Sequence, residues 1–125
     1  MGGTELAIHD PDFQAVFDPT KETLALRGNA DGRVASKLEQ LIHEIHDRGA
    51  AALPAEATIA LDLGDLEFMA ASCFNVFVVW VGLINELPPE RRYGLKFTIN
   101  PAVPWQRRSL TTLTCFATDI VTVSS

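Results

Sequence analysis

The chain has 125 residues, of which 47% are hydrophobic, and it carries a formal net charge of −6 with a pI near 4.9. This length fits one domain with one core, and this composition predicts folding rather than disorder. Because nucleic-acid phosphates repel an acidic protein, the charge argues against a nucleic-acid partner.

Cysteine content and hydropathy indicate the compartment. The two cysteines, Cys73 and Cys115, are too few for a disulfide framework. The first residues are polar and acidic and show no secretory signal. The longest apolar stretch, residues 69–84, is shorter than the roughly 20 residues that span a bilayer, and Ser72 and Asn75 interrupt it. We therefore expect a reduced, cytoplasmic protein without membrane insertion.

The N-terminal part of the chain predicts an arm and a hairpin. Residues 1–12 contain two glycines and a proline, and we expect a flexible arm there, before a single domain over residues 13–125. Alternating apolar residues predict strands at 13–17 and 23–28, with an Asp-Pro turn between them. The two strands are expected to form an antiparallel hairpin that ends at Gly28.

The rest of the chain alternates helices and strands. A helical stripe of apolar residues covers 33–48, and Gly49 predicts its end. A compact strand is expected at 58–63, where Gly64 and Asp65 break it. The later elements are a helix at 71–87, a strand at 95–99, a helix at 101–117 and a final strand at 120–123. Such alternation predicts a parallel sheet with right-handed crossovers.

Three local segments point to a known family. They are the segment LDLGDLEFM at 61–69, the segment INPAV at 99–103, and Gly28 at the end of the hairpin. In order and spacing, residues 13–123 resemble the STAS family of bacterial anti-sigma factor antagonists. The resemblance implies an α/β fold with a mixed sheet, an N-terminal antiparallel hairpin, a βαβαβ second half, and helices packed on the sheet.

The sequence departs from this family at its phosphorylation site. Where the family has Asp-Ser-Ser-Gly at the start of its second helix, this chain has Ala70, Ala71, Ser72 and Cys73. The first serine of the family accepts phosphate from a partner kinase, and Ala71 stands at that position. Alanine has no hydroxyl, so the resemblance implies a member without the usual phospho-switch. Ser72 can still accept a phosphate, or it can cap the helix by accepting a bond from a free amide.

Three functions from different classes are compatible with these residues. By resemblance, the chain is a non-catalytic protein-binding module of bacterial signal transduction and transcription regulation. It would need no cofactor and would bind an anti-sigma factor or a related regulatory kinase. The alternative is a structural or scaffold subunit that oligomerises through its apolar second helix. A hydrolase or transferase using Ser72 or Cys73 is the third, but the sequence shows no recognisable base.

The predicted helix at 71–87 is apolar on nearly every side, which exceeds what a surface helix needs. Either neighbouring helices cover both of its flanks, or one flank is a docking surface for another chain. In the second case the expected partner-binding residues are Asn75, Val76, Trp80 and Leu83. Trp80 would be the main anchor, because aromatic residues dominate interface energetics.

A basic pair offers a further candidate site. Arg107 and Arg108 follow Trp105 at the start of a predicted helix, where they could contact an anionic ligand or simply face solvent. The charge of the chain is uneven, with 13 acidic and 5 basic residues up to residue 68 and 3 acidic and 5 basic residues after it. The resulting −8 and +2 favour the second half as the surface for an acidic partner.

Other polar groups are expected to be structural. His43 and His46 have a spacing that could bind a metal, but no third ligand is apparent, so we expect a solvated helix face rather than a metal site. Asp62, Asp65 and Glu67 follow a strand without a phosphate-binding glycine loop. Turn chemistry explains these carboxylates better than acid–base catalysis does.

Overall fold

The structure, a computed structural model, describes residues 6–18, 21–52 and 58–124. Within these residues the chain forms strands, α-helices and two short 3-10 helices. In chain order they are β1 (Leu6–His9), β2 (Phe13–Asp18), β3 (Thr23–Ala30), η1 (Gly32–Val34), α1 (Ala35–Ala52), β4 (Thr58–Met69), α2 (Ala71–Asn85), η2 (Pro89–Arg91), β5 (Gly94–Thr98), α3 (Pro104–Phe116) and β6 (Val121–Ser124).

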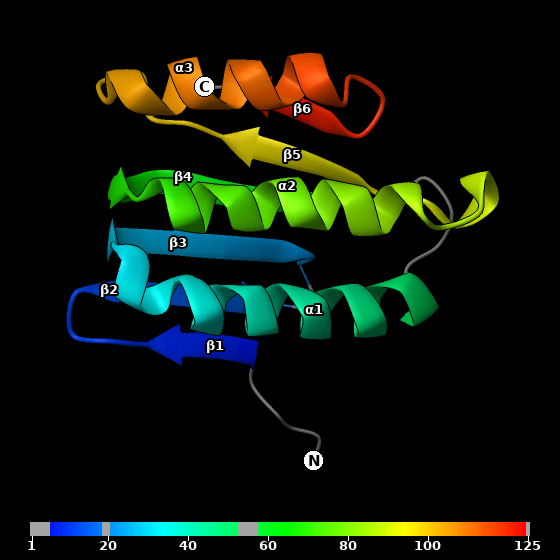
Figure 1. Cartoon of the computed structure of the whole chain (residues 1–125), viewed down its shortest axis with the longest axis horizontal. Coiled ribbons are helices and arrows are strands. Elements are labelled where there is room, and N and C mark those ends of the chain that lie inside the picture. Colours follow the sequence, from blue (N-terminus) through cyan, green and yellow to red (C-terminus); the bar gives the residue numbers. More distant parts are fainter. Residues whose placement is uncertain (1–5, 19–20, 53–57, 125) are drawn as a thin grey trace.

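The strands form one six-stranded sheet whose spatial order follows the sequence. β1, β2 and β3 pair antiparallel, whereas β3, β4, β5 and β6 pair parallel. α1, α2 and α3 connect the successive parallel strands and lie side by side over one face of the sheet (Figure 1). The predicted mixed sheet, with its antiparallel hairpin and its parallel second half, is therefore confirmed.

The core lies between the sheet and the three helices. Along β2, Phe13 and Ala15 are buried while Gln14 between them is exposed, and the other strands show similar alternation. The helices close the core with their own apolar stripes, for example Leu38 and Ile42 of α1. The opposite face of the sheet carries mostly polar or small side chains, including Gln14, Ala25, Arg27, Asp62 and Lys96.

Gly28 has a special backbone conformation that fixes the end of the hairpin. Its φ of +90° is one that residues with a side chain rarely adopt, and an added Cβ would clash with the backbone carbonyl of Asp12. The next residue, Asn29, donates its amide to that carbonyl at 2.7 Å. The strand continues past Gly28 to Ala30, so the prediction that it ends at Gly28 is wrong by two residues.

Two other predicted boundaries also need correction. Residues 6–9 form β1 and pair with β2, so this part of the predicted flexible arm is wrong; residues 1–5 lie outside the described residues. α1 continues past Gly49 to Ala52. A glycine inside a helix costs only about 1 kcal/mol, so neighbouring residues can override it as a stop signal.

β4 is twice as long as predicted. Beyond Leu63 it continues to Met69, because Arg27–Ala30 of β3 pairs with this second half through two register shifts. β5 pairs only with residues 58–62, so the second half of β4 extends beyond it. We call residues 63–69 the β4 extension. Gly64 lies at an irregular position of the strand, as glycines in strands often do, and does not end it.

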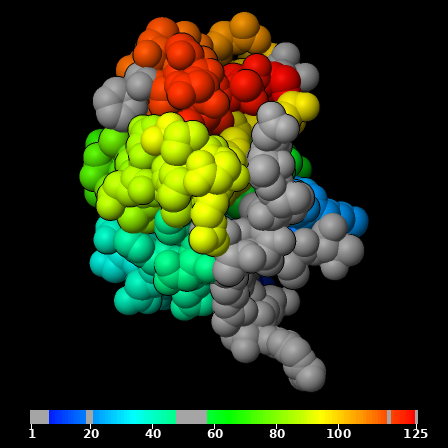
Figure 2. Space-filling model, turned by 90° about the vertical axis from the view of Figure 1, so that its right-hand side faces the viewer, coloured from blue at the N-terminus to red at the C-terminus, as the bar shows by residue number. Residues whose placement is uncertain are grey.

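α2 occupies the middle of the helical layer (Figure 1). Seen from the end of the helices, the last turn of α2 and η2 fill the space between α1 and the pair formed by α3 and β6 (Figure 2). Neighbouring helices thus flank α2 on both sides, and α1 packs closely against it. In the part of the chain that the structure describes, no helix combines the length and apolarity needed to cross a membrane.

Candidate functional site

The candidate site lies where β4 ends and α2 begins, at the carboxyl end of the parallel strands. In open α/β sheets, ligands usually bind at the carboxyl ends of the strands. Ala70 has an extended backbone and donates its amide to the carbonyl of Ala30 at 2.7 Å. Its methyl side chain caps nothing, so no side chain bonds to the first amides of α2 from this position. Ala71 and Ser72 form an exposed first turn.

Ser72 is exposed and does not cap the helix. The N-cap is Ala70, so the interpretation of Ser72 as an N-cap is wrong. Its hydroxyl lies beside the loop after β3, where a Cβ added to Gly32 would be 3.6 Å from Ser72 Oγ. The hydroxyl is therefore in a position to be modified, while Ala71 offers no acceptor.

Cys73 is a packed thiol and not a nucleophile. It is fully buried, and its Sγ donates to the carbonyl of Asp31 at 3.2 Å. Burial is the main cause that raises the pKa of Cys73, and the Asp31 carboxylate raises it further. A nucleophilic cysteine needs the opposite shift. This bond instead ties α2 to the loop after β3.

A charged cluster borders the site on the side of β1. Arg33 Nη2 lies 3.1 Å from Asp31, 3.5 Å from Asp12 and 3.9 Å from Asp10. Lys37 approaches the other oxygen of Asp10 at 3.8 Å. The hydrogen bond with Asp31 and the neighbouring carboxylates raise the pKa of Arg33. Sequence reasoning missed this cluster, because only the β1–β2 turn brings Asp10 and Asp12 to the start of α1.

The β4 extension borders the site on the other side, where polar side chains bind its carbonyls. Gln106 is completely buried, and its Nε2 donates to the carbonyls of Leu63 and Leu66 at 2.8 and 2.7 Å. Trp105 Nε1 donates to the carbonyl of Glu67 at 2.9 Å. Asn100 Nδ2 donates to that of Gly64 at 3.1 Å. These bonds satisfy a strand edge that no other strand pairs in the described part of the chain.

The basic pair Arg107 and Arg108 is exposed on α3, directly after these buried and half-buried donors. Trp105 and Gln106 are therefore structural, while the two arginines lie at the surface. The exposed Phe68 of the β4 extension, at 49% exposure, is one of two large hydrophobic side chains in the described residues that the fold leaves open to solvent. An anion contact at Arg107 and Arg108 stays a prediction.

The expected docking flank of α2 needs correction. Trp80 is 0% and Val76 2% exposed, so neither reaches the surface, and their prediction as partner-binding residues is wrong for this fold. The physical reason is that α1 packs against this flank. Trp80 also donates its Nε1 to the Tyr93 hydroxyl at 2.8 Å. The explanation by neighbouring helices therefore accounts for Trp80.

The solvent-facing side of α2 is nevertheless almost uncharged. Asn75 and Gly82 are exposed, and Val79 and Leu83 are partly exposed. A Cβ added at Gly82 would meet nothing within 4 Å. Asn75 and Leu83 thus remain surface candidates from the predicted set. We call Ala71, Asn75, Val79, Gly82 and Leu83 the outer face of α2.

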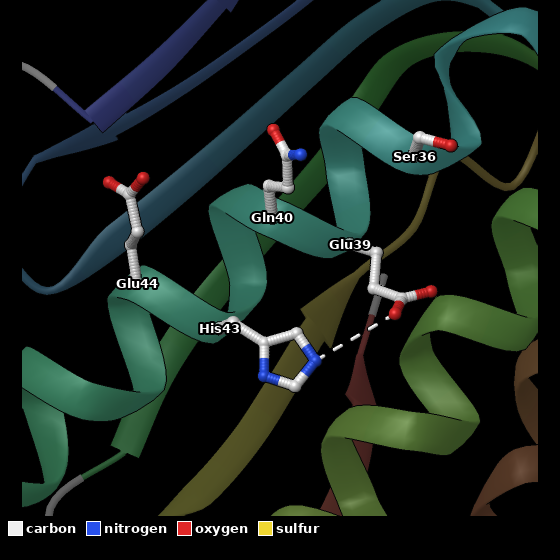
Figure 3. A pocket seen from close by; sticks show the side chains of 5 residues that line it. All are labelled: Ser36, Glu39, Gln40, His43 and Glu44. Carbon is white, nitrogen blue, oxygen red and sulfur yellow. Dashed lines mark ion pairs between the residues drawn. The ribbon is translucent and has the colours of Figure 1, made fainter.

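The two histidines of α1 lie in different environments. His43 Nε2 lies 3.8 Å from Glu39 on the outer surface of α1, beside a shallow hollow whose other lining residues include Ser36 and Gln40 (Figure 3). His46, predicted to be solvated, is instead partly buried against Tyr93. Among the described residues, no cluster of three or more potential metal ligands occurs.

The carboxylates of β4 do not converge either. Asp62 accepts the Gly64 amide at 2.9 Å, which is turn-like chemistry within an irregular strand. Asp65 forms an exposed ion pair with Arg27 at 3.6 Å. Both residues line a small hollow on the open face of the sheet. Asp62 therefore shows the predicted turn chemistry, whereas Asp65 pairs with a residue of the neighbouring strand.

Comparison with known proteins supports the fold. The chain is similar to the crystal structure of an anti-sigma factor antagonist from Mycobacterium paratuberculosis, with a TM-score of 0.61 and 16% sequence identity. The match covers 92% of this chain and 90% of that chain. The chain therefore has a STAS-like fold. No protein-family model matches the sequence, and no curated protein matches it significantly.

Proposed function

We propose that the chain is a non-catalytic regulatory module that binds a protein partner through the start of α2 and its outer face. The observation that carries this proposal is the exposed, uncharged outer face of α2, which begins at the carboxyl edge of a STAS-like sheet. The similar structure is that of an anti-sigma factor antagonist. By this likeness the partner is an anti-sigma factor or a related regulatory kinase of a bacterial cytoplasm.

The proposed module acts without the usual switch. A phosphate at the first turn of α2 would place about two negative charges where a partner docks, and so would control binding. Ala71 cannot carry it. The buried Cys73 thiol, with its raised pKa, argues against the alternative of a nucleophilic enzyme. The chain would therefore be competent for binding at all times unless Ser72 is modified.

The substitution Asn75→Arg tests this surface. Asn75 is exposed on the outer face, so a long charged side chain there should obstruct docking while leaving the core intact. The measurement is capture of partners from bacterial cytoplasm by the tagged chain, followed by titration of the captured protein against both variants. We expect at least a tenfold loss of affinity. Gln40→Arg, on the exposed side of α1, is the matched control.

The outcomes of this test are distinct. Equal affinity of the Asn75→Arg variant and the wild type for the captured partner would contradict docking on the outer face. If the purified chain alone is an oligomer that Asn75→Arg dissociates, the scaffold alternative replaces the regulatory one. Sedimentation of the wild type and of Asn75→Arg, each without partner, decides between these two results.

A further inference from the structure

A buried tyrosine joins helices α1 and α2. Tyr93 lies between η2 and β5 and is 2% exposed. Its hydroxyl accepts a hydrogen bond from Trp80 Nε1 of α2 at 2.8 Å and lies 2.6 Å from His46 Nδ1 of α1. The His46 and Tyr93 rings are also in contact, with centroids 5.8 Å apart. We call these three residues the Tyr93 bridge.

Counting protons assigns the state of His46. An indole N–H can only donate, so the Tyr93 oxygen is the acceptor in its bond with Trp80. The phenol has one proton, and that proton is free to point at His46 Nδ1. The arrangement is complete when His46 is neutral, with a lone pair on Nδ1 and its proton on Nε2.

Protonation of His46 breaks this arrangement. Both ring nitrogens of an imidazolium carry protons, so Nδ1 would donate to the Tyr93 oxygen and could no longer accept. The phenolic proton would then lose its acceptor. Burial raises the pKa of Tyr93 to about 12, so the phenol does not lose its proton to adapt. A buried donor without a partner is costly.

The surroundings of His46 also oppose a charge. Its partial burial, the largest effect, lowers the pKa of His46, and His43 on the same helix lowers it further. Asp47 of α1 and Glu86 at the end of α2 act in the opposite direction but do not outweigh burial. Tyr93, on the segment before β5, faces the ring as a neutral phenol.

We propose that the Tyr93 bridge is a pH-sensitive latch between α1 and α2, which is closed with neutral His46 and loosens in mild acid. The latch holds the helix whose outer face is the proposed docking surface. It stands on these contacts alone and does not depend on the identity of a partner.

The direction of the pH effect follows from linkage. The pKa of His46 in the folded chain lies below its ordinary value of 6.5, so the unfolded chain binds the proton more readily. Stability is therefore complete above pH 6.5 and is lost as the pH falls from there toward the folded pKa. Between these two pKa values, protonation of His46 increases the unfolding equilibrium constant by up to about tenfold for each pH unit by which the pH falls.

The first test compares denaturant unfolding at pH 7.5 and 5.0 for the wild type, His46→Gln and His43→Gln. The glutamine in His46→Gln can accept from Tyr93 but does not titrate. We expect the wild type and His43→Gln to lose more stability on acidification than His46→Gln does. Equal pH dependence of the wild type and His46→Gln would overturn the latch.

A second test uses the wild-type chain alone, in case His46→Gln does not fold. The ring signals of the histidines and the indole N–H signal of Trp80 are followed by NMR from pH 8 to 5. We expect the Trp80 indole signal to shift with the same midpoint as His46, below the ordinary histidine value of 6.5. A Trp80 signal that stays unchanged while His46 titrates would overturn the latch.

Discussion

The two ends of α2 have opposite environments although both belong to one apolar helix. At the start, Ala71 and Ser72 are exposed, and the N-cap contributes no side-chain bond. Toward the end, Trp80 is buried and bonded to Tyr93, and Arg92 donates to the carbonyls of Asn85 and Leu87. The later part of α2 is held by several side-chain bonds, whereas Ala71 and Ser72 in its first turn are exposed to solvent.

This difference shows why the apolar composition of α2 was a poor guide to its exposed surface. The large apolar residues of α2 fill the core, because α1, α3 and the sheet surround the inner arc of the helix. The surface that remains combines the exposed Asn75 and Gly82 with the partly exposed Val79 and Leu83. This proposed docking face carries no charged side chain and no exposed aromatic anchor among Ala71, Asn75, Val79, Gly82 and Leu83.

Truncating Trp80 should cause the largest loss of stability. Trp80→Ala removes a fully buried ring and leaves the Tyr93 hydroxyl without its donor, so we expect a loss of about 3–5 kcal/mol in the free energy of unfolding. Denaturant unfolding measures this loss. Trp105→Ala, which truncates the half-buried tryptophan, should cost less. A loss for Trp80→Ala below about 1 kcal/mol, closer to the effect of a surface substitution, would mean that Trp80 is not part of the core.

The second-largest effect is expected for Gln106, which binds the carbonyls of the β4 extension. Gln106→Ala removes both bonds to the carbonyls of Leu63 and Leu66 in the β4 extension, at a cost of about 1–3 kcal/mol for the buried groups left unpaired. Thermal or denaturant unfolding measures it. Arg107→Ala, one residue further on the exposed side, is the control and should be nearly neutral. Equal effects of the two substitutions would show that Gln106 does not support the extension.

The smallest effect on stability is expected for Ser72, in the first turn of α2. Ser72→Ala should change the free energy of unfolding by no more than about 0.5 kcal/mol, because Ser72 is exposed and does not cap α2. Denaturant unfolding measures this change.

The same variant tests whether Ser72 accepts a phosphate. After incubation with a kinase partner, intact mass should show phosphate on the wild type but not on Ser72→Ala. Stoichiometric phosphate that persists in the variant would exclude Ser72 as the acceptor.

Periodicity alone predicted most of the secondary structure. The alternation in residues 13–17 and 58–63, the helical stripes, and the alternation of helices and strands in the second half required only local patterns. These patterns predicted the mixed sheet because short connections and right-handed crossovers leave few topologies. The substitution of Ala71 for the family's serine was also readable directly, because it concerns the identity of a residue.

Boundaries that depend on pairing were not predictable in this way. The second half of β4 exists because β3 pairs with one edge and because Gln106, Trp105 and Asn100 bind its carbonyls from a distant segment. β1 exists because β2 offers it an edge. The causes of the longer β4 lie far away in sequence, whereas β1 depends on pairing with a neighbouring strand, and local propensity shows neither contact.

The sequence by itself determined that α2 would be apolar and that its first turn would lack the acceptor hydroxyl, since both follow from side-chain identity. Only the tertiary structure decided which arc of the helix is covered. The burial of Trp80 depends on α1 crossing beside it and on a tyrosine 13 residues later that accepts its N–H. Periodicity places side chains around a helix axis, but the neighbours that remove them from water come from elsewhere in the chain.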